Sequence, residues 1–83
     1  MDFKQAVGQT IQRTRKERAF TQEKLAFYAK MSVSALSLIE RGENAPSLYT
    51  LFAIARVIGI PATDLVAQIE AENPDVDVFK VME

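Results

Sequence analysis

The sequence predicts an all-α fold of five short helices, and three observations support this prediction. Apolar residues recur at intervals of three and four through residues 3–72, the spacing that places them on one face of a helix. Ser, Thr, Gly and Pro stand where such helices would begin and end. A length of 83 residues allows a single domain, and the 48% hydrophobic and 25% charged residues are typical of a globular chain.

The first two expected helices occupy the basic N-terminal part of the chain. Apolar residues recur every four positions from Phe3 to Ile11, so residues 3–18 are predicted to form an amphipathic helix. Thr21 is a candidate N-cap for the second helix, because its hydroxyl oxygen can accept a hydrogen bond from a free amide of the first turn. The apolar positions of this helix continue to about Ala29.

The third and fourth helices are expected on either side of a turn. Ser32 is the N-cap candidate of a short third helix that ends at Gly42. The turn residues Gly, Asn and Pro follow, and a fourth helix begins from Ser47. Because the fourth helix is apolar on nearly every side, it is predicted to be the central helix of the core.

A fifth helix and a tail complete the chain. Gly59 ends the fourth helix, and Pro61 fixes the entry to a fifth helix that ends before Asn73. The domain is therefore expected to cover residues 1–72. The tail, residues 73–83, alternates valine with polar residues, which suits an extended segment that is too short to be stable alone. It is a candidate for dimerisation, although it could equally pack on its own chain.

The composition excludes most catalytic chemistry. The chain has no cysteine and no histidine, so no disulfide framework, zinc finger, catalytic thiol or histidine base can be built from it. An enzyme, a cofactor, a bound metal and a small-molecule substrate are therefore not expected. No apolar stretch approaches the roughly 20 residues that span a bilayer, which favours a cytoplasmic protein without a membrane partner.

Charge is divided unevenly between the two halves of the chain. Residues 1–41 contain eight lysines and arginines against four acids, a net of plus four, whereas residues 42–83 contain two against seven, a net of minus five. A basic end that faces a polyanion, with the acidic end turned away, is one interpretation. A solvated surface on which charges happen to cluster is the other.

Several short motifs at fixed spacing carry a family resemblance. Thr21–Ala26 reads TQEKLA, Ile39–Gly42 reads IERG, and Pro46–Leu48 reads PSL. Together they resemble the XRE-like helix-turn-helix family of Cro and cI type regulators over about residues 7–69. The resemblance implies a Cro/cI repressor-like domain that binds double-stranded DNA as a homodimer, on an inverted-repeat operator. The compact size and Leu25–Phe27 look somewhat like the restriction-modification controller proteins of this family.

The resemblance also implies a site. In the family the third helix lies in the major groove, whose width of roughly 12 Å matches a helix. With Leu36 and Ile39 facing inward, the side chains left to read bases are Val33, Ser34, Ser37 and Leu38. The positions expected to contact phosphates are Thr21, Gln22, Ser32, Arg41 and Asn44. Arg15 matches an arginine that forms an internal ion pair with the glutamate matched by Glu40.

Two features depart from the family pattern. Lys30 stands where a turn glycine is common, so a strained or altered turn is expected there. The side chains of Val33 and Leu38 cannot form hydrogen bonds with bases. Sequence specificity would then come from apolar contact with thymine methyls, from hydrogen bonds of the serine hydroxyls, and from the shape of the groove. The alternative is a protein-interaction module such as an antitoxin, because these apolar side chains lie near Phe27 and Tyr28.

Dimerisation is assigned to the C-terminal part of the chain. One such module buries too little surface on DNA for secure specificity, so two-fold pairing is expected. The fifth helix and the tail have more apolar residues than one small core needs. The residues assigned to the dimer contact are Leu65, Val66, Ile69, Val76, Val78 and Val81.

Overall fold

The five predicted helices are present in the structure, a computed structural model that describes residues 2–72. Their bounds agree with the sequence prediction within two residues, and the described residues form no strand. The alternating segment of the tail, with Val76, Val78 and Val81, lies outside the described residues. The helices are α1 (Phe3–Glu17), α2 (Gln22–Tyr28), α3 (Val33–Glu40), α4 (Leu48–Ile58) and α5 (Ala62–Glu72).

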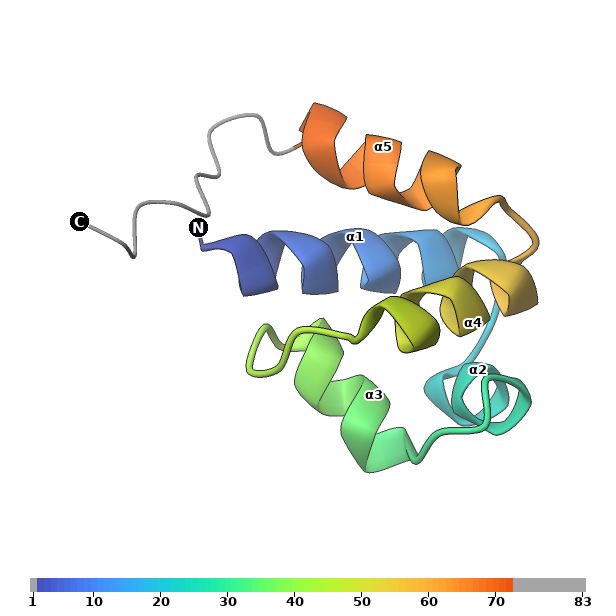
Figure 1. Cartoon of the computed structure of the whole chain (residues 1–83). Coiled ribbons are helices and arrows are strands. Elements are labelled where there is room, and N and C mark those ends of the chain that lie inside the picture. Colours follow the sequence, from blue (N-terminus) through green and yellow to red (C-terminus); the bar gives the residue numbers. More distant parts are fainter. Residues whose placement is uncertain (1, 73–83) are drawn as a thin grey trace.

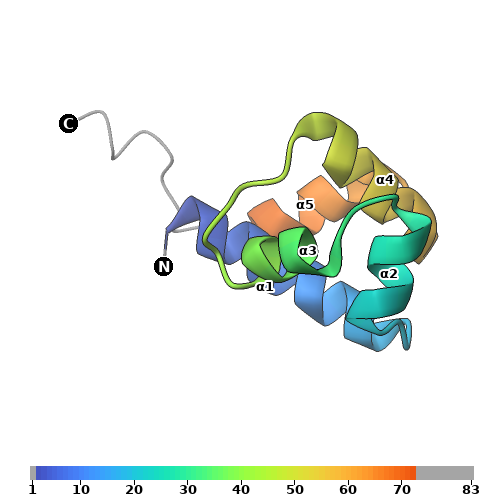
Figure 2. The same cartoon turned by 90° about the horizontal axis from the view of Figure 1, so that it is seen from below.

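The helices are arranged in three levels in the view of Figure 1. α5 lies at the top, α1 and α4 lie in the middle, and α2 and α3 lie at the bottom. α1 contacts both α3 and α5, so it connects the upper and lower levels. Seen from below, α3 lies in front of α1 (Figure 2), so no other helix of residues 2–72 covers its lower side.

Local sequence explains where four of the five helices begin. Thr21, Ser32 and Ser47 each accept a hydrogen bond from the backbone amide three residues later, as N-caps do. Asp2 caps α1 in the same way, and the Gln5 side chain reciprocates by accepting from the Asp2 amide, a capping box that the sequence analysis did not identify.

Apolar side chains from all five helices meet in one core. Ile11, Leu25, Leu36, Ile54 and Leu65 are the largest side chains that are completely buried. Burying a side chain of this size contributes about 1.5–3 kcal/mol. The core therefore holds α3 by Leu36 and Ile39 and leaves its other face unpacked.

The prediction that α4 is surrounded by neighbours is wrong for its first half. Ile54, Ala55 and Ile58 are buried, but Leu48 is 71% exposed and Tyr49 is 78% exposed. The physical reason is that α4 packs on α2 and α5, which cover only part of its circumference.

No single helix among residues 2–72 is long and apolar enough to cross a membrane. α4 and α5 meet that length and composition test only as a pair, and the pair is bent by 101°. The bend falls at Gly59, whose φ of 97° is a left-handed conformation that glycine adopts readily.

Candidate nucleic-acid interface

The candidate interface is built from α2, the turn after it, and α3. Ala29 is the C-cap of α2, and Ser32, only three residues later, is the N-cap of α3. Lys30 has φ of 59°, the left-handed conformation that the sequence analysis expected to be strained without glycine. The Met31 amide donates to the carbonyl of Ala26 at 2.9 Å, which closes the turn and fixes the angle between the two helices.

The two faces of α3 have different environments. Leu36 and Ile39 are buried, as expected, and fix the rotation of the helix about its axis. Val33 and Ser34 are exposed at the N-terminal end, whereas Ser37 and Leu38 are half-buried. All four candidate base-reading residues retain some exposure, and the first two have the greatest freedom to touch a ligand.

Thr21 and Ser32 have their hydroxyl oxygens engaged as caps. Thr21 Oγ1 accepts from the Lys24 amide at 3.1 Å, and Ser32 Oγ accepts from the Ala35 amide at 3.0 Å. Both residues are exposed, and a hydroxyl that accepts one hydrogen bond still has a hydrogen to donate. Capping and phosphate contact are therefore chemically compatible at both positions.

Arg15 and Glu40 form the expected internal ion pair. Arg15 Nε and Nη2 donate to the two Glu40 carboxylate oxygens at 2.7 and 3.0 Å, a bidentate geometry. The side chains are only 8% and 1% exposed. Arg15 Nη1 also donates to the carbonyl of Phe20 at 2.8 Å. The pair therefore ties α1 to the C-terminal end of α3.

Gln22 joins the same network, which the sequence analysis did not predict. Its Nε2 donates to Glu40 Oε1 at 2.9 Å, and the side chain is half-buried. An amide nitrogen carries two hydrogens, so one remains for a phosphate. The first turn of α2 is thus held against the end of α3 through the Glu40 carboxylate.

Arg41 and Asn44 lie in the exposed loop after α3. Arg41 Nε contacts Glu43 Oε2 at 3.1 Å, an ion pair between residues two positions apart in the loop. Both side chains are more than half exposed, so the pair is weak and can open. The Glu43 and Asn44 amides donate to the carbonyl of Leu38, which holds this loop against the end of α3.

The basic N-terminal half has fewer available cations than its net charge implies. Arg15 is buried in its ion pair, and Arg18 donates to the carbonyl of Ile58 at 3.3 Å. Arg13 contacts Glu17 and also donates to Gln68 at 3.3 Å. Part of the positive charge of residues 1–41 therefore holds the fold together, which refines the interpretation drawn from charge alone.

The assignment of the dimer contact needs correction at two positions. Leu65 is completely buried and Ile69 is 7% exposed, because both pack into the core of their own chain. Leu65 therefore has no surface left for a second copy, and Ile69 has little. Val66, which is 39% exposed, remains available. Helical periodicity identifies the apolar positions of α5 but cannot distinguish those that face the chain's own core.

Exposed apolar side chains elsewhere complete the description of the surface. Phe27 and Tyr28 at the end of α2 are 74% and 60% exposed, and their rings pack edge to face. Within residues 2–72 no group of three acidic side chains is gathered as a metal site would require.

Comparison with known proteins identifies the family to which this chain belongs. The pattern of the helix-turn-helix family matches residues 11–65, more than half of the chain. An uncharacterized HTH-type transcriptional regulator, y4dJ, of Sinorhizobium fredii is 35% identical over 66 residues, which cover 80% of this chain and 86% of that protein. The immunity repressor protein of Bacillus phage phi105 is 47% identical over 62 residues, which cover 75% of this chain but only 43% of the phage protein.

Solved structures agree with the family in fold. The clp gene regulator ClgR of Corynebacterium glutamicum superimposes with a TM-score of 0.81 at 22% identity, covering 87% of this chain and 77% of that chain. The restriction-modification controller protein C.AhdI of Aeromonas hydrophila gives a TM-score of 0.72 at 27% identity, covering 75% and 94%. The expected Cro/cI-like architecture is confirmed, and the chain belongs to the helix-turn-helix family of DNA-binding transcriptional regulators.

Proposed function

We propose that the protein binds an inverted-repeat operator as a homodimer, with α3 of each copy in the major groove of one half-site. The observation that carries this proposal is the exposure of one face of α3 at an edge of the molecule while Leu36 and Ile39 hold the opposite face. An α-helix fits the major groove, where each base pair presents a distinct pattern of donors and acceptors.

The contacts divide into two groups under this proposal. Val33 and Leu38 contact thymine methyls, and the hydroxyls of Ser34 and Ser37 contact polar base edges. The phosphate contacts come from Thr21, Gln22, Ser32, Arg41 and Asn44. The exposed or half-buried positions of these residues leave both groups accessible to DNA.

The geometry of the duplex supports two-fold pairing. Two reading helices about 34 Å apart reach successive major grooves on one side of the DNA. The exposed apolar side chains of α4 and α5, which water surrounds in a single copy, support such an association. Repression is the proposed direction of regulation, since one relative is named an immunity repressor.

Selection of binding sites from random duplexes at two salt concentrations tests this function. We expect an enriched palindrome whose affinity falls steeply as salt rises, because phosphate contacts release counterions. Arg41→Ala should weaken binding to all sequences alike, and Ser34→Ala should relax the preference at particular base pairs. Failure to enrich any sequence, or an identical effect of both substitutions, would contradict the proposal.

A protein-interaction module is the second candidate function, and the exposed ring pair of Phe27 and Tyr28 favours it. Aromatic side chains are enriched at protein interfaces. Replacing both rings with serine would abolish binding to a protein partner, such as a toxin, but should leave operator binding intact. Loss of operator binding without loss of the fold would instead place these rings in the DNA contact.

A further inference from the structure

Helices α4 and α5 present a common surface, which we call the α4–α5 face. The large apolar side chains of these two helices that are exposed are Leu48, Tyr49, Phe52 and Val66. Phe52 is central to this surface, because it lines two shallow hollows of about 330 and 230 Å³. Ala62 lines both hollows as well, so they adjoin one another in the angle between the helices.

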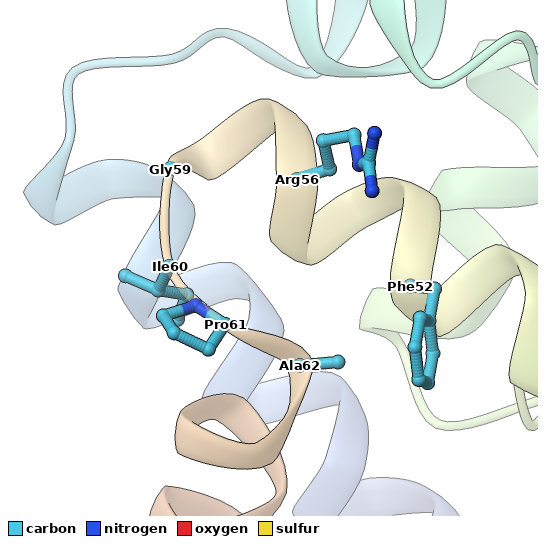
Figure 3. Close-up of a pocket in the computed structure, with 6 residues that line it drawn as sticks. All are labelled: Phe52, Arg56, Gly59, Ile60, Pro61 and Ala62. Atoms are coloured by element: carbon cyan, nitrogen blue, oxygen red, sulfur yellow. The ribbon is translucent and has the colours of Figure 1, made fainter.

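The charges bordering the α4–α5 face are separated by helix. Arg56 is the one charged residue of α4, whereas every charged residue of α5 is acidic. Arg56 lines the larger hollow with Phe52 and the segment Gly59–Ala62 (Figure 3). Glu70 lines the smaller hollow with Phe52 and Val66. The cation and the carboxylate therefore border different hollows that share Phe52.

Neither charge has an ionic partner among residues 2–72 of its own copy. Arg56 and Glu70 are exposed, and neither makes an ion pair with any of the described residues. The surface has an apolar centre, a cation at one hollow and a carboxylate at the other. It therefore has both the positive and the negative charge that a contact between two identical copies needs. DNA would require cations alone, so this face does not suit it.

We infer that a second copy of the chain covers the α4–α5 face, with α4 of each copy on α5 of the other. This inference rests on the proposed homodimer and specifies how the copies meet. In a two-fold contact, residue i meets residue j and j meets i. With the two-fold axis close to Phe52, Arg56 meets the partner's Glu70, and the symmetry repeats the pair on the other side.

The alternative two-fold registers are electrostatically unfavourable. Placing α4 on α4 would bring Arg56 towards the partner's Arg56, and placing α5 on α5 would oppose two acidic helices. Like charges across an interface suppress the wrong arrangement, and opposite charges select the register. Phe52 and Tyr49 supply the apolar contact, since buried aromatic side chains anchor protein interfaces.

Charge reversal tests the inference on the full chain by sedimentation equilibrium. Arg56→Glu and Glu70→Arg each replace two attractive pairs with two repulsive ones, so each should raise the dimer dissociation constant about tenfold or more. The double variant restores opposite charges, and its dissociation constant should return to within about threefold of the parent's. Lys16→Glu is the matched control, because it reverses an exposed cation of α1 outside the α4–α5 face and should leave the constant unchanged.

Three outcomes would overturn the inference: a parent chain that stays monomeric at about 100 μM, single reversals without effect, or a double variant as weak as the single ones. Phe52→Ser adds an independent arm, since it should give a folded monomer with a near-parental melting curve. A dimer that survives Phe52→Ser would also overturn it.

Binding to a duplex with one half-site separates this inference from the proposed function. A monomeric Phe52→Ser variant that still prefers its half-site leaves α3 as the reading helix. Failure of the charge rescue together with intact half-site binding overturns only the arrangement of the dimer. Loss of sequence preference by the parent chain on both half-site and full operator would overturn the proposed function itself.

Discussion

Replacement of Glu40 by alanine should be among the most destabilising substitutions in this protein. The Glu40 carboxylate accepts hydrogen bonds from Arg15 Nε, Arg15 Nη2 and Gln22 Nε2 at 2.7, 3.0 and 2.9 Å. Alanine removes all of these acceptors and leaves the Arg15 guanidinium buried, with the carbonyl of Phe20 as its remaining partner in the network. Stranding a buried charge in this way costs about 3–5 kcal/mol.

The melting temperature measures this loss directly. In a domain of this size, 1 kcal/mol corresponds to a shift of about 4–8 °C, so Glu40→Ala should lower the melting temperature by at least about 12 °C. Calorimetry or circular dichroism provides the assay. Glu17→Ala is the control, because it breaks the Arg13–Glu17 pair, whose side chains are 38% and 59% exposed, and should cost less than about 1 kcal/mol.

A double substitution separates the two possible origins of the loss. Arg15→Met combined with Glu40→Leu removes both charges and retains most of the apolar volume, so it should be more stable than Glu40→Ala. Equal melting temperatures for Glu40→Ala and the parent would refute the argument that the pair is buried and strongly coupled. If the double variant is as unstable as Glu40→Ala, the loss of stability comes from packing and not from the stranded charge.

Three further predictions concern backbone and charge. Lys30→Gly should raise stability by about 1 kcal/mol in urea unfolding, since φ of 59° is strained for lysine; a loss would contradict it. Gly8→Ala should prevent native packing of α1 on α3, because the new Cβ would clash with the backbone carbonyl oxygen of Ile39; a native melting curve would refute this. Glu43→Ala should raise affinity for DNA of any sequence in fluorescence anisotropy, because it frees Arg41 from its ion pair, and unchanged affinity would count against Arg41 as a phosphate contact.

The periodicity of the sequence was sufficient to predict the helices, but it was insufficient to predict which of their apolar side chains are exposed. Leu36 and Ile39 were assigned to the core correctly, because a spacing of three residues and a neighbouring cap fix their face on a short helix. Leu65 and Ile69 were assigned to a dimer contact and are buried in their own chain. Periodicity specifies which residues share a face, and only the packing of α5 on α1 and α4 determines what that face contacts.

The candidate site shows the same limit. The Arg15–Glu40 pair could be predicted because both positions matched motif positions, yet Gln22 was assigned to phosphate alone. Its bond to Glu40 joins residues 18 positions apart and depends on the angle between α2 and α3. The local pattern of α2 has no signal for that contact, since a glutamine at the start of a helix is equally compatible with solvent.

By itself, the order of residues determined five helices, their caps, the absence of thiol and imidazole chemistry, and the motifs of a regulator. The helices and their caps depend on neighbours three or four positions away, where the chain's own geometry sets the contacts, and the excluded chemistry depends on composition alone. Only the tertiary arrangement decided that Leu48, Tyr49 and Phe52 face solvent, and that part of the basic half is used in internal bonds. Exposure depends on which helix covers which side, and that depends on long-range packing of the core.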